Sequence, residues 1–515
     1  MTENLTETPV QPASDVTSDG REHSLELDTA GMRALVEAAL ERIVAHVASL
    51  PRQPMSDTRG GEELARSLAE PLPETATPVP ELLDLLFDRA VKPTYNTASP
   101  GYLAYIPGGG LFQSAVADLI ADAVNRYTSV FATAPALARL EANVVDWFCQ
   151  IVGFPQEARG TLSTGGSLAN FTALFTARRE RLPDDFLSGV IYASEQIHHS
   201  VAKAALLAGF PERSLRSLPT DERFRLRVDA LETAIAEDRA RGLTPFLVAA
   251  SAGTTNTGAV DPLDEIAEIS AREGLWMHVD AAYGGFFLLT EDGKRAMRGI
   301  ERANSVVLDP HKGLFLPYGT GAVLVRDGQA LRRAHALTAD YMPHMQSDPD
   351  LVDFCLYSPE LSRPFRGLRV WLPFKMHGAG AFREQLEEKL ALARLATERI
   401  RTMEGMEILA EPQLSLLAFR LAPPGIDDPE ELNRLNRRLL ERVNDRQRVF
   451  LTGTMLGDRF ALRICVLSFR THRDRMEEGL EDLEAARREV MEDPHHPGPL
   501  LPPPPTPLTG RRGRS

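Results

Sequence analysis

Two apolar runs of this sequence lead to side chains that could do chemistry together, one to a lysine and the other to a carboxylate. Residues 306–309 lead into Pro310, His311 and Lys312, and residues 275–280 end at Asp280. A lysine at the carboxyl end of a buried strand can form a Schiff base with a carbonyl cofactor, and a carboxylate can pair with a pyridinium nitrogen. Most lysines are solvated surface charges. Lys312 alone is therefore weak evidence. Together with Asp280, it predicts pyridoxal 5′-phosphate (PLP) as cofactor.

A glycine-rich turn supplies a candidate phosphate site. Thr164, Gly165, Gly166 and Ser167 precede a helical pattern over residues 168–179. Glycines let the backbone approach an anion, and a helix N-terminus offers unpaired N–H groups and a positive dipole end. Such a turn alone is usually only a helix cap. Together with Asp280 and Lys312, it predicts a phosphate-binding turn.

A histidine pair, His198 and His199, follows another apolar run at residues 189–193. One imidazole could lie flat on a pyridine ring. The plainer interpretation is a histidine that caps a loop, and the position after a strand favours the functional one.

These side chains need a sheet that brings strand ends together. Between residues 100 and 326, short apolar runs alternate with helical segments, which is typical of a mainly parallel α/β sheet. Ligands of such sheets bind beyond the carboxyl ends of the strands, so Asp280 and Lys312 should meet there. The predicted strands are residues 189–193, 246–250, 275–280, 306–309 and 322–326.

The sequence predicts a large sheet domain with four further parts on either side of it. Residues 1–21 should be a disordered tail, and 22–99 a helical dimerisation segment whose first helix begins near Asp28. The apolar stripe of that helix, from Met32 to Val47, packs either on its own chain or on a partner subunit. Residues 100–380 form the large PLP-binding domain, and 381–491 a small α+β domain with helices at 381–401, 429–443 and 473–491 and β-structure at 406–420 and 450–469. The Pro-rich segment 492–515 is either a mere tail or a ligand for an SH3-type groove.

Composition limits the partners. The formal net charge is −15 over 515 residues, which argues against nucleic acid or an anionic membrane and favours a small-molecule substrate. The first 20 residues have no secretory pattern and no run is long enough to span a bilayer, so we expect a cytoplasmic protein. Three separated cysteines exclude a disulfide framework and a Cys-x-x-Cys metal site. We expect no metal.

The sequence resembles the group II PLP-dependent amino acid decarboxylases over residues 27–491. The most specific segments are His278-Val279-Asp280-Ala281-Ala282-Tyr283-Gly284-Gly285, Asp309-Pro310-His311-Lys312 and residues 363–371. The resemblance implies a fold type I enzyme that works as a homodimer with shared active sites. It implies decarboxylation of an L-amino acid through an external aldimine and a quinonoid, with an aromatic substrate favoured.

The resemblance also implies roles for single residues. Lys312 matches the Schiff-base lysine, Asp280 the partner of the ring nitrogen, and His198 and Ala282 the residues on the two ring faces. The remaining cofactor-binding positions are Gly165, Gly166, Ser167, Thr255, Asp309 and His311. Asp309 stands where aromatic decarboxylases usually carry Asn.

Two regions depart from the family pattern. Phe354 stands where a mobile loop of aromatic decarboxylases carries a proton-donating tyrosine, and Tyr357 lies three residues later. Either Tyr357 or His198 delivers the proton to Cα, or the product is an aldehyde formed by oxidative deamination, or this variable loop is out of register. A catalytically silent dimer that serves as an interaction module is a further alternative.

The substrate pocket departs as well. Residues 102–110, with Tyr105 and Gly108, resemble the substrate-contacting loop, and glycines at 108–110 replace small polar residues. We expect these glycines to leave room for a bulky aromatic side chain. Tyr127 and Ser129 should face the pocket from the partner subunit.

Overall fold

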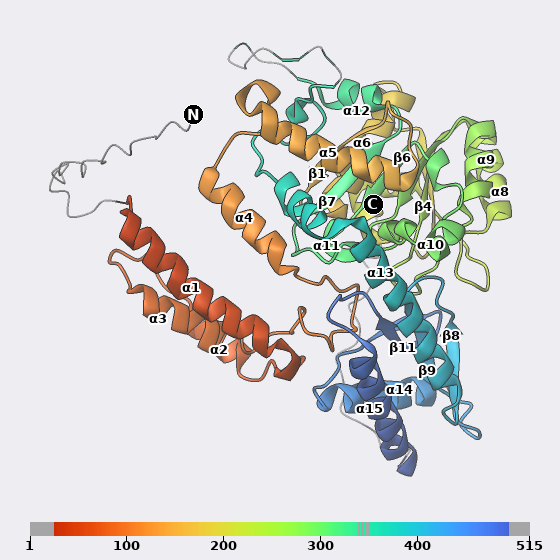
Figure 1. Cartoon of the computed structure of the whole chain (residues 1–515). Helices are drawn as coiled ribbons and strands as arrows, with labels where there is room; N and C mark the ends of the chain where they lie inside the picture. Colours follow the sequence, from red (N-terminus) through yellow and green to blue (C-terminus); the bar gives the residue numbers. More distant parts are fainter. Residues whose placement is uncertain (1–24, 338–339, 341–344, 347, 349, 494–515) are drawn as a thin grey trace, which may run out of the picture. The chain divides into compact units, whose positions relative to one another are not determined.

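The computed structural model describes residues 25–337, 340, 345–346, 348 and 350–493 (Figure 1). The chain divides into two compact units, one of residues 1–49 and 58–94 and one of residues 50–57 and 95–515. The terminal tails predicted at 1–21 and 492–515 lie outside the described residues, apart from Glu492 and Asp493.

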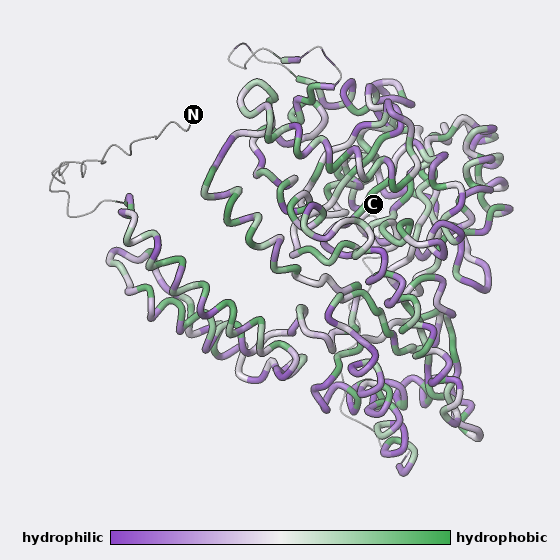
Figure 2. The backbone as a smooth tube through the Cα atoms, in the orientation of Figure 1, coloured by the Kyte–Doolittle hydropathy of each residue, from purple (hydrophilic) through white to green (hydrophobic). Residues whose placement is uncertain are grey.

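The first unit is helical. It contains α1 (Thr29–Ser49), α2 (Gly61–Ser67), α3 (Val79–Asp84) and the π-helical turn η2 (Leu85–Ala90). The predicted start near Asp28 is confirmed, because the Asp28 carboxylate accepts a hydrogen bond from Gly31 N at 2.7 Å and so caps α1. Hydrophobic and hydrophilic stretches alternate along α1 in Figure 2. Its apolar stripe is 37–52 % exposed at Met32, Leu35, Val36, Leu40, Ile43 and Val44.

The second unit is built around a seven-stranded sheet in the order β1-β7-β6-β5-β4-β2-β3. Strand β7 runs antiparallel to both of its neighbours, and the other pairs are parallel. The fold type I prediction of a mainly parallel sheet is confirmed. The strands are β1 (Arg159–Ser163), β2 (Gly189–Ser194), β3 (Leu215–Leu218), β4 (Thr244–Ser251), β5 (Trp276–Asp280), β6 (Ser305–Leu308) and β7 (Gly321–Val325).

Two of these strands, β1 and β3, were not expected from the sequence. Both lie at the edges of the sheet. Edge strands are covered on fewer sides, so their sequences Arg-Gly-Thr-Leu-Ser and Leu-Arg-Ser-Leu lack the continuous apolar run that marks a buried parallel strand.

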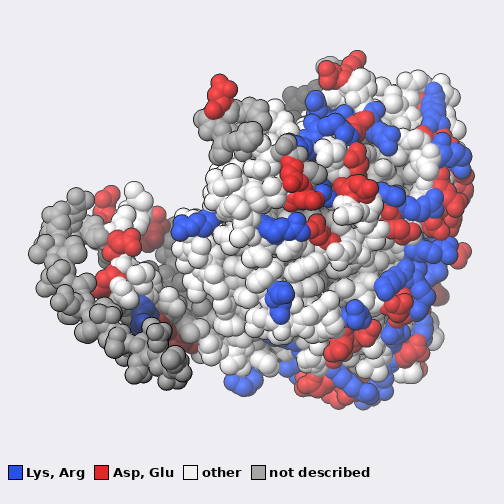
Figure 3. Space-filling view, turned by 45° about the horizontal axis from the view of Figure 1, so that its top comes forward, with Lys and Arg blue, Asp and Glu red and all other residues white. Residues whose placement is uncertain are grey.

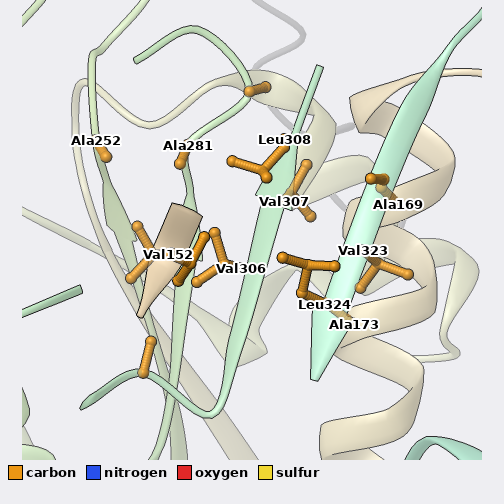
Figure 4. Packing of buried hydrophobic residues seen from close by; sticks show 14 of the residues in the cluster. Val152, Ala169, Ala173, Ala252, Ala281, Val306, Val307, Leu308, Val323 and Leu324 are labelled. Atoms are coloured by element: carbon orange, nitrogen blue, oxygen red, sulfur yellow. The ribbon is translucent and has the colours of Figure 1, made fainter. Parts of the chain in front are cut away.

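Helices cover both faces of the sheet. Those that contact its strands include α5 (Pro135–Val152), α6 (Gly166–Arg181), α8 (Val228–Ala240), α9 (Leu263–Glu273), α11 (Pro310–Gly313) and α12 (Gly328–His335). The same part of the chain also contains α4 (Phe112–Val124), α7 (His199–Leu207) and α10 (Glu291–Ala296). Ala169 and Ala173 of α6 lie one turn apart and face Val323 and Leu324 of β7 (Figure 4). Their short side chains let α6 pack closely on the sheet, which fixes the position of its N-terminus.

A second, antiparallel sheet has the order β10-β11-β9-β8. Its strands are β8 (Met406–Ala410), β9 (Leu416–Leu421), β10 (Thr452–Leu456) and β11 (Arg459–Cys465), and it packs with α13 (Gly367–Arg401), α14 (Pro429–Asp445) and α15 (Arg473–Glu492). The predicted helices near 429 and 473 are confirmed, and each predicted β segment contains two strands.

The helix predicted over residues 381–401 is confirmed as the second of two helices joined in α13, and the first, which begins at Gly367, was not predicted. The two helices meet at a kink, where Gly378 takes the non-helical angles φ 72° and ψ 159°. Pro373 lies inside the first helix. The domain boundary expected at residue 380 falls within α13 and stays a prediction.

Charges of both signs are interspersed along one side of the face drawn in Figure 3, and a broad area beside them carries few charges. That face has no continuous basic surface of the kind that binds a phosphate backbone. Among the described residues, no helix combines the length and apolar character needed to cross a bilayer.

Candidate active site

A cavity of about 270 Å³ lies at the carboxyl ends of the central strands. Asp280 follows β5, the turn at residues 309–312 follows β6, and α6 begins at the turn after β1. The cavity brings together the predicted residues Gly165, Gly166, Ser167, His198, Thr255, Asp280, Ala282, Asp309, His311 and Lys312.

Helix α6 orients the Asp280 carboxylate. Asn170 Nδ2 donates a hydrogen bond to Asp280 Oδ2 at 2.9 Å, and Ala282 N donates to Oδ1 at 3.1 Å. The side chain of Asp280 is only partly accessible from the cavity, with the residue 8 % exposed. These two hydrogen bonds fix the orientation of the carboxylate.

A series of buried hydrogen bonds from Trp276 through Ser305 and His278 holds the Asn170 side chain in place. Trp276 Nε1 donates to Ser305 Oγ, Ser305 bonds to His278 Nδ1, and His278 Nε2 bonds to Asn170 Oδ1, each at 2.9 Å. Asn170 Oδ1 can only accept, so neutral His278 carries its proton on Nε2 and donates it there. Nδ1 of His278 then accepts from the Ser305 hydroxyl, which itself accepts from the indole N–H. Burial lowers the pKa of His278 to about 4 and keeps it neutral.

Hydrogen bonds that continue from Asn170 through Ser200 fix the tautomer of His198. Asn170 Nδ2 also donates to Ser200 Oγ at 2.9 Å, and Ser200 contacts His198 Nδ1 through its hydroxyl at 2.7 Å and its backbone N–H at 3.3 Å. Since the backbone N–H can only donate, Nδ1 is an acceptor and the proton of neutral His198 lies on Nε2. Burial lowers the pKa of His198, and the charge of Asp280 opposes that shift.

Lys312 lies in the short helix α11 with its Nζ 2.8 Å from Asp309 Oδ2. Burial opposes the charge of the ammonium group, but the attraction and hydrogen bond of Asp309, with a smaller effect of Asp280, raise the pKa of Lys312 above its ordinary value. His311 turns its Nδ1 to the carbonyl of Thr320 at 2.5 Å, and burial lowers its pKa.

Arg463 of β11 holds the backbone around Thr255. Its guanidinium donates to the carbonyls of Thr255 and Tyr105, and to that of Asn256 at 2.9 Å. Arg463 is 4 % exposed. It ties the second sheet to the loop that lines the cavity, and the sequence did not single it out.

The four residues expected in the substrate pocket do not line this cavity. Tyr105 is half exposed, and its N–H donates to Thr452 Oγ1 at 3.3 Å. Tyr127 donates from its hydroxyl to the carbonyl of Leu361 at 3.0 Å, and Ser129 is fully buried, where its carbonyl accepts from Cys355 N at 3.1 Å. A contribution of Tyr127 and Ser129 to a partner's site stays a prediction.

The expectation that glycines at 108 and 109 leave room is wrong. A Cβ at Gly108 would lie 2.4 Å from the carbonyl oxygen of His311, and one at Gly109 would lie 2.6 Å from the Phe469 ring. Backbone and ring already fill these positions, so the glycines permit close packing beside the Lys312 turn.

Phe354 and Tyr357 lie in the core and not on the cavity wall. Phe354 is 1 % exposed in the turn η7 (Phe354–Leu356), and its ring centroid lies 4.6 Å beneath the Arg363 guanidinium, which pairs with buried Glu141. Tyr357 is 3 % exposed. Of the proton donors considered, His198 alone reaches the cavity within the described part of this chain.

Sequence reasoning missed Asn170, Trp276, Ser200 and Ser305. A usable signal existed for Asn170, because it lies three residues after Ser167 and therefore on the same face of α6. His278 stood in a quoted segment without a role, although a histidine inside an apolar strand must find hydrogen-bond partners.

The fold and cavity define a PLP-dependent enzyme of fold type I. The side chains fit the cofactor chemically, since an amine, a carboxylate oriented by two donors, and a glycine turn at a helix N-terminus all open into one cavity. The pyridoxal-dependent decarboxylase conserved domain matches residues 62–422. The chain belongs to this family and is a PLP-dependent amino acid decarboxylase, a lyase.

Known proteins extend the comparison. An aromatic-L-amino-acid decarboxylase of Bacillus atrophaeus is 34% identical over 468 residues, covering 91% of this chain and 98% of that protein. Histidine decarboxylase of Homo sapiens is 32% identical over 428 residues, 78% of this chain and 63% of that protein. The crystal structure of Oryza sativa TDC with PLP and tryptamine has a TM-score of 0.87 at 26% identity, covering 91% of this chain and 100% of that one.

Proposed function

We propose that this enzyme converts an aromatic L-amino acid to its amine and carbon dioxide. The observation that best supports this reaction is that Lys312, Asp280, His198 and the turn at the start of α6 line one cavity. The aromatic substrate is supported by the relative from Bacillus atrophaeus, which is similar over nearly its whole length. Aldehyde formation is less well supported, because the relatives above 30% identity are named as decarboxylases.

Each residue of the cavity has a separate role in the proposed reaction. PLP, when bound, supplies an electron-accepting ring for the electron pair left at Cα. Asp280, held by Asn170, would keep a proton on the ring nitrogen, and Lys312 would provide the amine that holds the cofactor. The N–H groups of Gly166 and Ser167 would bind the phosphate at the start of α6.

His198 is the proposed proton donor to Cα. Its neutral ring lines the cavity and carries the proton on Nε2, away from the Ser200 contact. A donor within hydrogen-bond reach of Cα is required once carbon dioxide leaves. Thr255 and Ala282 also line the cavity, and Ala282 would pack on the face of the bound ring that His198 does not cover.

We also infer a homodimer. The exposed apolar residues of α4, Val116, Leu119, Ile120 and Val124, and the stripe of α1 offer area that a second copy could cover. Sedimentation of the holoenzyme at working concentration tests this, and a fully active monomer would contradict it.

A substrate panel tests the proposed reaction. Purified enzyme with PLP should release equal amounts of carbon dioxide and amine from L-tryptophan, L-tyrosine or L-dihydroxyphenylalanine, and less from L-histidine or L-glutamate. Asp280→Asn should retain cofactor and lose about 10²–10³-fold in kcat, because a neutral amide does not hold the ring nitrogen protonated. Preference for a non-aromatic amino acid would overturn the substrate, and near wild-type kcat in Asp280→Asn would remove Asp280 from the mechanism.

A further inference from the structure

A second buried carboxylate, Asp309, lies beside the cofactor lysine. Its residue is 2 % exposed, and Oδ2 lies 2.8 Å from Lys312 Nζ and 3.7 Å from His311 Nε2. The other oxygen, Oδ1, is buried without a hydrogen-bond partner within the described residues. A buried carboxylate oxygen without a donor is costly, so a proton or ligand is needed to complete this group.

The Asp309 carboxylate lies against the phosphate-binding turn. A Cβ at Gly166, the first residue of α6, would lie 3.0 Å from Oδ2 and 3.4 Å from Oδ1. A Cβ at Gly321 would lie 2.9 Å from Oδ1 and 2.6 Å from Gly165 Cα. Glycine at both positions admits the carboxylate to the place where an anion meets the helix N-terminus.

The surrounding charges do not offset two anions. The positive charge of Lys312 is attracted by both Asp309 and Asp280. Burial lowers the pKa of His198 and of His311 and so favours the neutral form of each. Arg369 is occupied by Asp118 at 2.7 Å and by Thr320 Oγ1 at 2.7 Å. The buried Cys465 thiol has a raised pKa and stays neutral. A phosphate dianion would therefore meet the like charge of Asp309 at close range.

We propose that Asp309 makes cofactor binding proton-linked: when the phosphate dianion binds at the α6 turn, the Asp309 carboxylate takes up one proton from solvent. The neutral acid removes the repulsion and can donate a hydrogen bond. PLP is then held more weakly as pH rises. An asparagine at this position would bind phosphate without that proton, so the residue sets how firmly this enzyme keeps its cofactor across pH.

The test measures binding of a probe that has no aldehyde, so that Lys312 chemistry does not contribute. The dissociation constant of 4′-deoxypyridoxine 5′-phosphate is determined for the apoenzyme and for Asp309→Asn from pH 6 to 8.5. The ratio of the wild-type value to the variant value should rise with pH by about tenfold for each unit while one proton is taken up. Comparison at each pH cancels the titration of the probe.

Calorimetry gives an independent readout. In two phosphate-free buffers of different ionisation enthalpy, wild type should take up about one more proton than Asp309→Asn on binding the probe. Exposed Asp229, paired with Arg227, provides the matched control Asp229→Asn, which should behave as wild type. For Asp309→Ala, the ratio of the wild-type to the variant dissociation constant must also rise with pH. This second variant keeps the test decisive if Asp309→Asn does not fold.

Three outcomes would overturn the inference. They are a ratio that does not change with pH, weaker binding by both Asp309 variants at every pH, or the same pH-dependent ratio with 4′-deoxypyridoxine, which lacks the phosphate. The inference rests on PLP as cofactor and not on the proposed substrate. Failure to decarboxylate aromatic amino acids would overturn the proposed function and leave this result unaffected.

Discussion

Asn170 Nδ2 lies 2.9 Å from Asp280 Oδ2, so helix α6 contacts the carboxylate proposed to pair with the ring nitrogen. The same helix begins at Gly166 in the turn proposed to bind the phosphate. One rigid helix therefore sets the spacing between the two ends of the cofactor site. Such a link orients the catalytic group before the reaction, which is how a fixed site lowers a barrier.

Replacing Asn170 should separate orientation from charge. Asn170→Ala removes the donor to Asp280 and the acceptor of His278 while Asp280 stays in place. We expect kcat to fall by about 10-fold to 100-fold, as when other oriented catalytic groups lose their support. Steady-state kinetics with saturating PLP measures the effect. Thr172→Ala, whose hydroxyl bonds only to Leu168 O within α6, is the control and should keep most activity.

Lys312 should hold the cofactor covalently. Freshly reconstituted protein is expected to be yellow, and borohydride reduction followed by peptide mapping should place the pyridoxyl group on Lys312. Lys389, a lysine buried away from the cavity, serves as an internal control because it bonds to Glu388 and the carbonyl of Thr471. A pyridoxyl group on any lysine other than Lys312 would refute the assignment.

The buried histidine His278 should make stability depend on pH. Burial lowers its pKa to about 4, below the ordinary value of 6.5, so the unfolded chain binds more protons between these values. Stability is then highest above pH 6.5 and is lost as pH falls toward 4. Between pH 7.5 and 5.0 the loss from this group is about 2 kcal/mol.

Urea denaturation at these two pH values checks the effect. His278→Gln should be less stable at pH 7.5, because the hydrogen bonds to Ser305 and Asn170 change, but should lose about 2 kcal/mol less than wild type on acidification. An identical pH dependence in both proteins would show that His278 does not titrate in this range.

Amine should be the sole product, with His198 as the group whose loss matters. Phe354 and Tyr357 are buried away from the cavity, so Phe354→Tyr and Tyr357→Phe should leave the ratio of amine to aldehyde unchanged. His198→Gln should lower kcat by about 10² or more. Amine, aldehyde and oxygen consumption are measured for each protein. Aldehyde from wild type, reduced in Phe354→Tyr, would instead favour the oxidative alternative.

The gathering of these side chains around one cavity was predictable because they follow apolar strands or a glycine turn. Asp280, Lys312 and the turn at Gly165 are all marked by such local patterns, and the parallel sheet brings them together. The supporting groups were not predictable in the same way. Asn170 and Ser305 are ordinary polar residues, and only tertiary contact shows that each has a buried histidine as partner.

The expectation of open space at the glycines was wrong for a different reason. A glycine in a sequence indicates either open space or close packing, and these two have opposite consequences for a ligand. At Gly108 the structure decides for close packing. The exposed positions of Tyr105 and Tyr127 likewise could not be derived without the fold.

The contact of Gly108 with the His311 carbonyl has a practical meaning for changing what this enzyme accepts. Any side chain introduced at 108 would push directly on the turn that holds Lys312, and one at 109 would displace the Phe469 ring. Libraries aimed at new substrates should therefore leave both positions unchanged. Gly110 has space for a Cβ, with the Ala98 Cβ 3.8 Å away, but its φ of 63° strains any side chain, and Asn or Asp would be strained least.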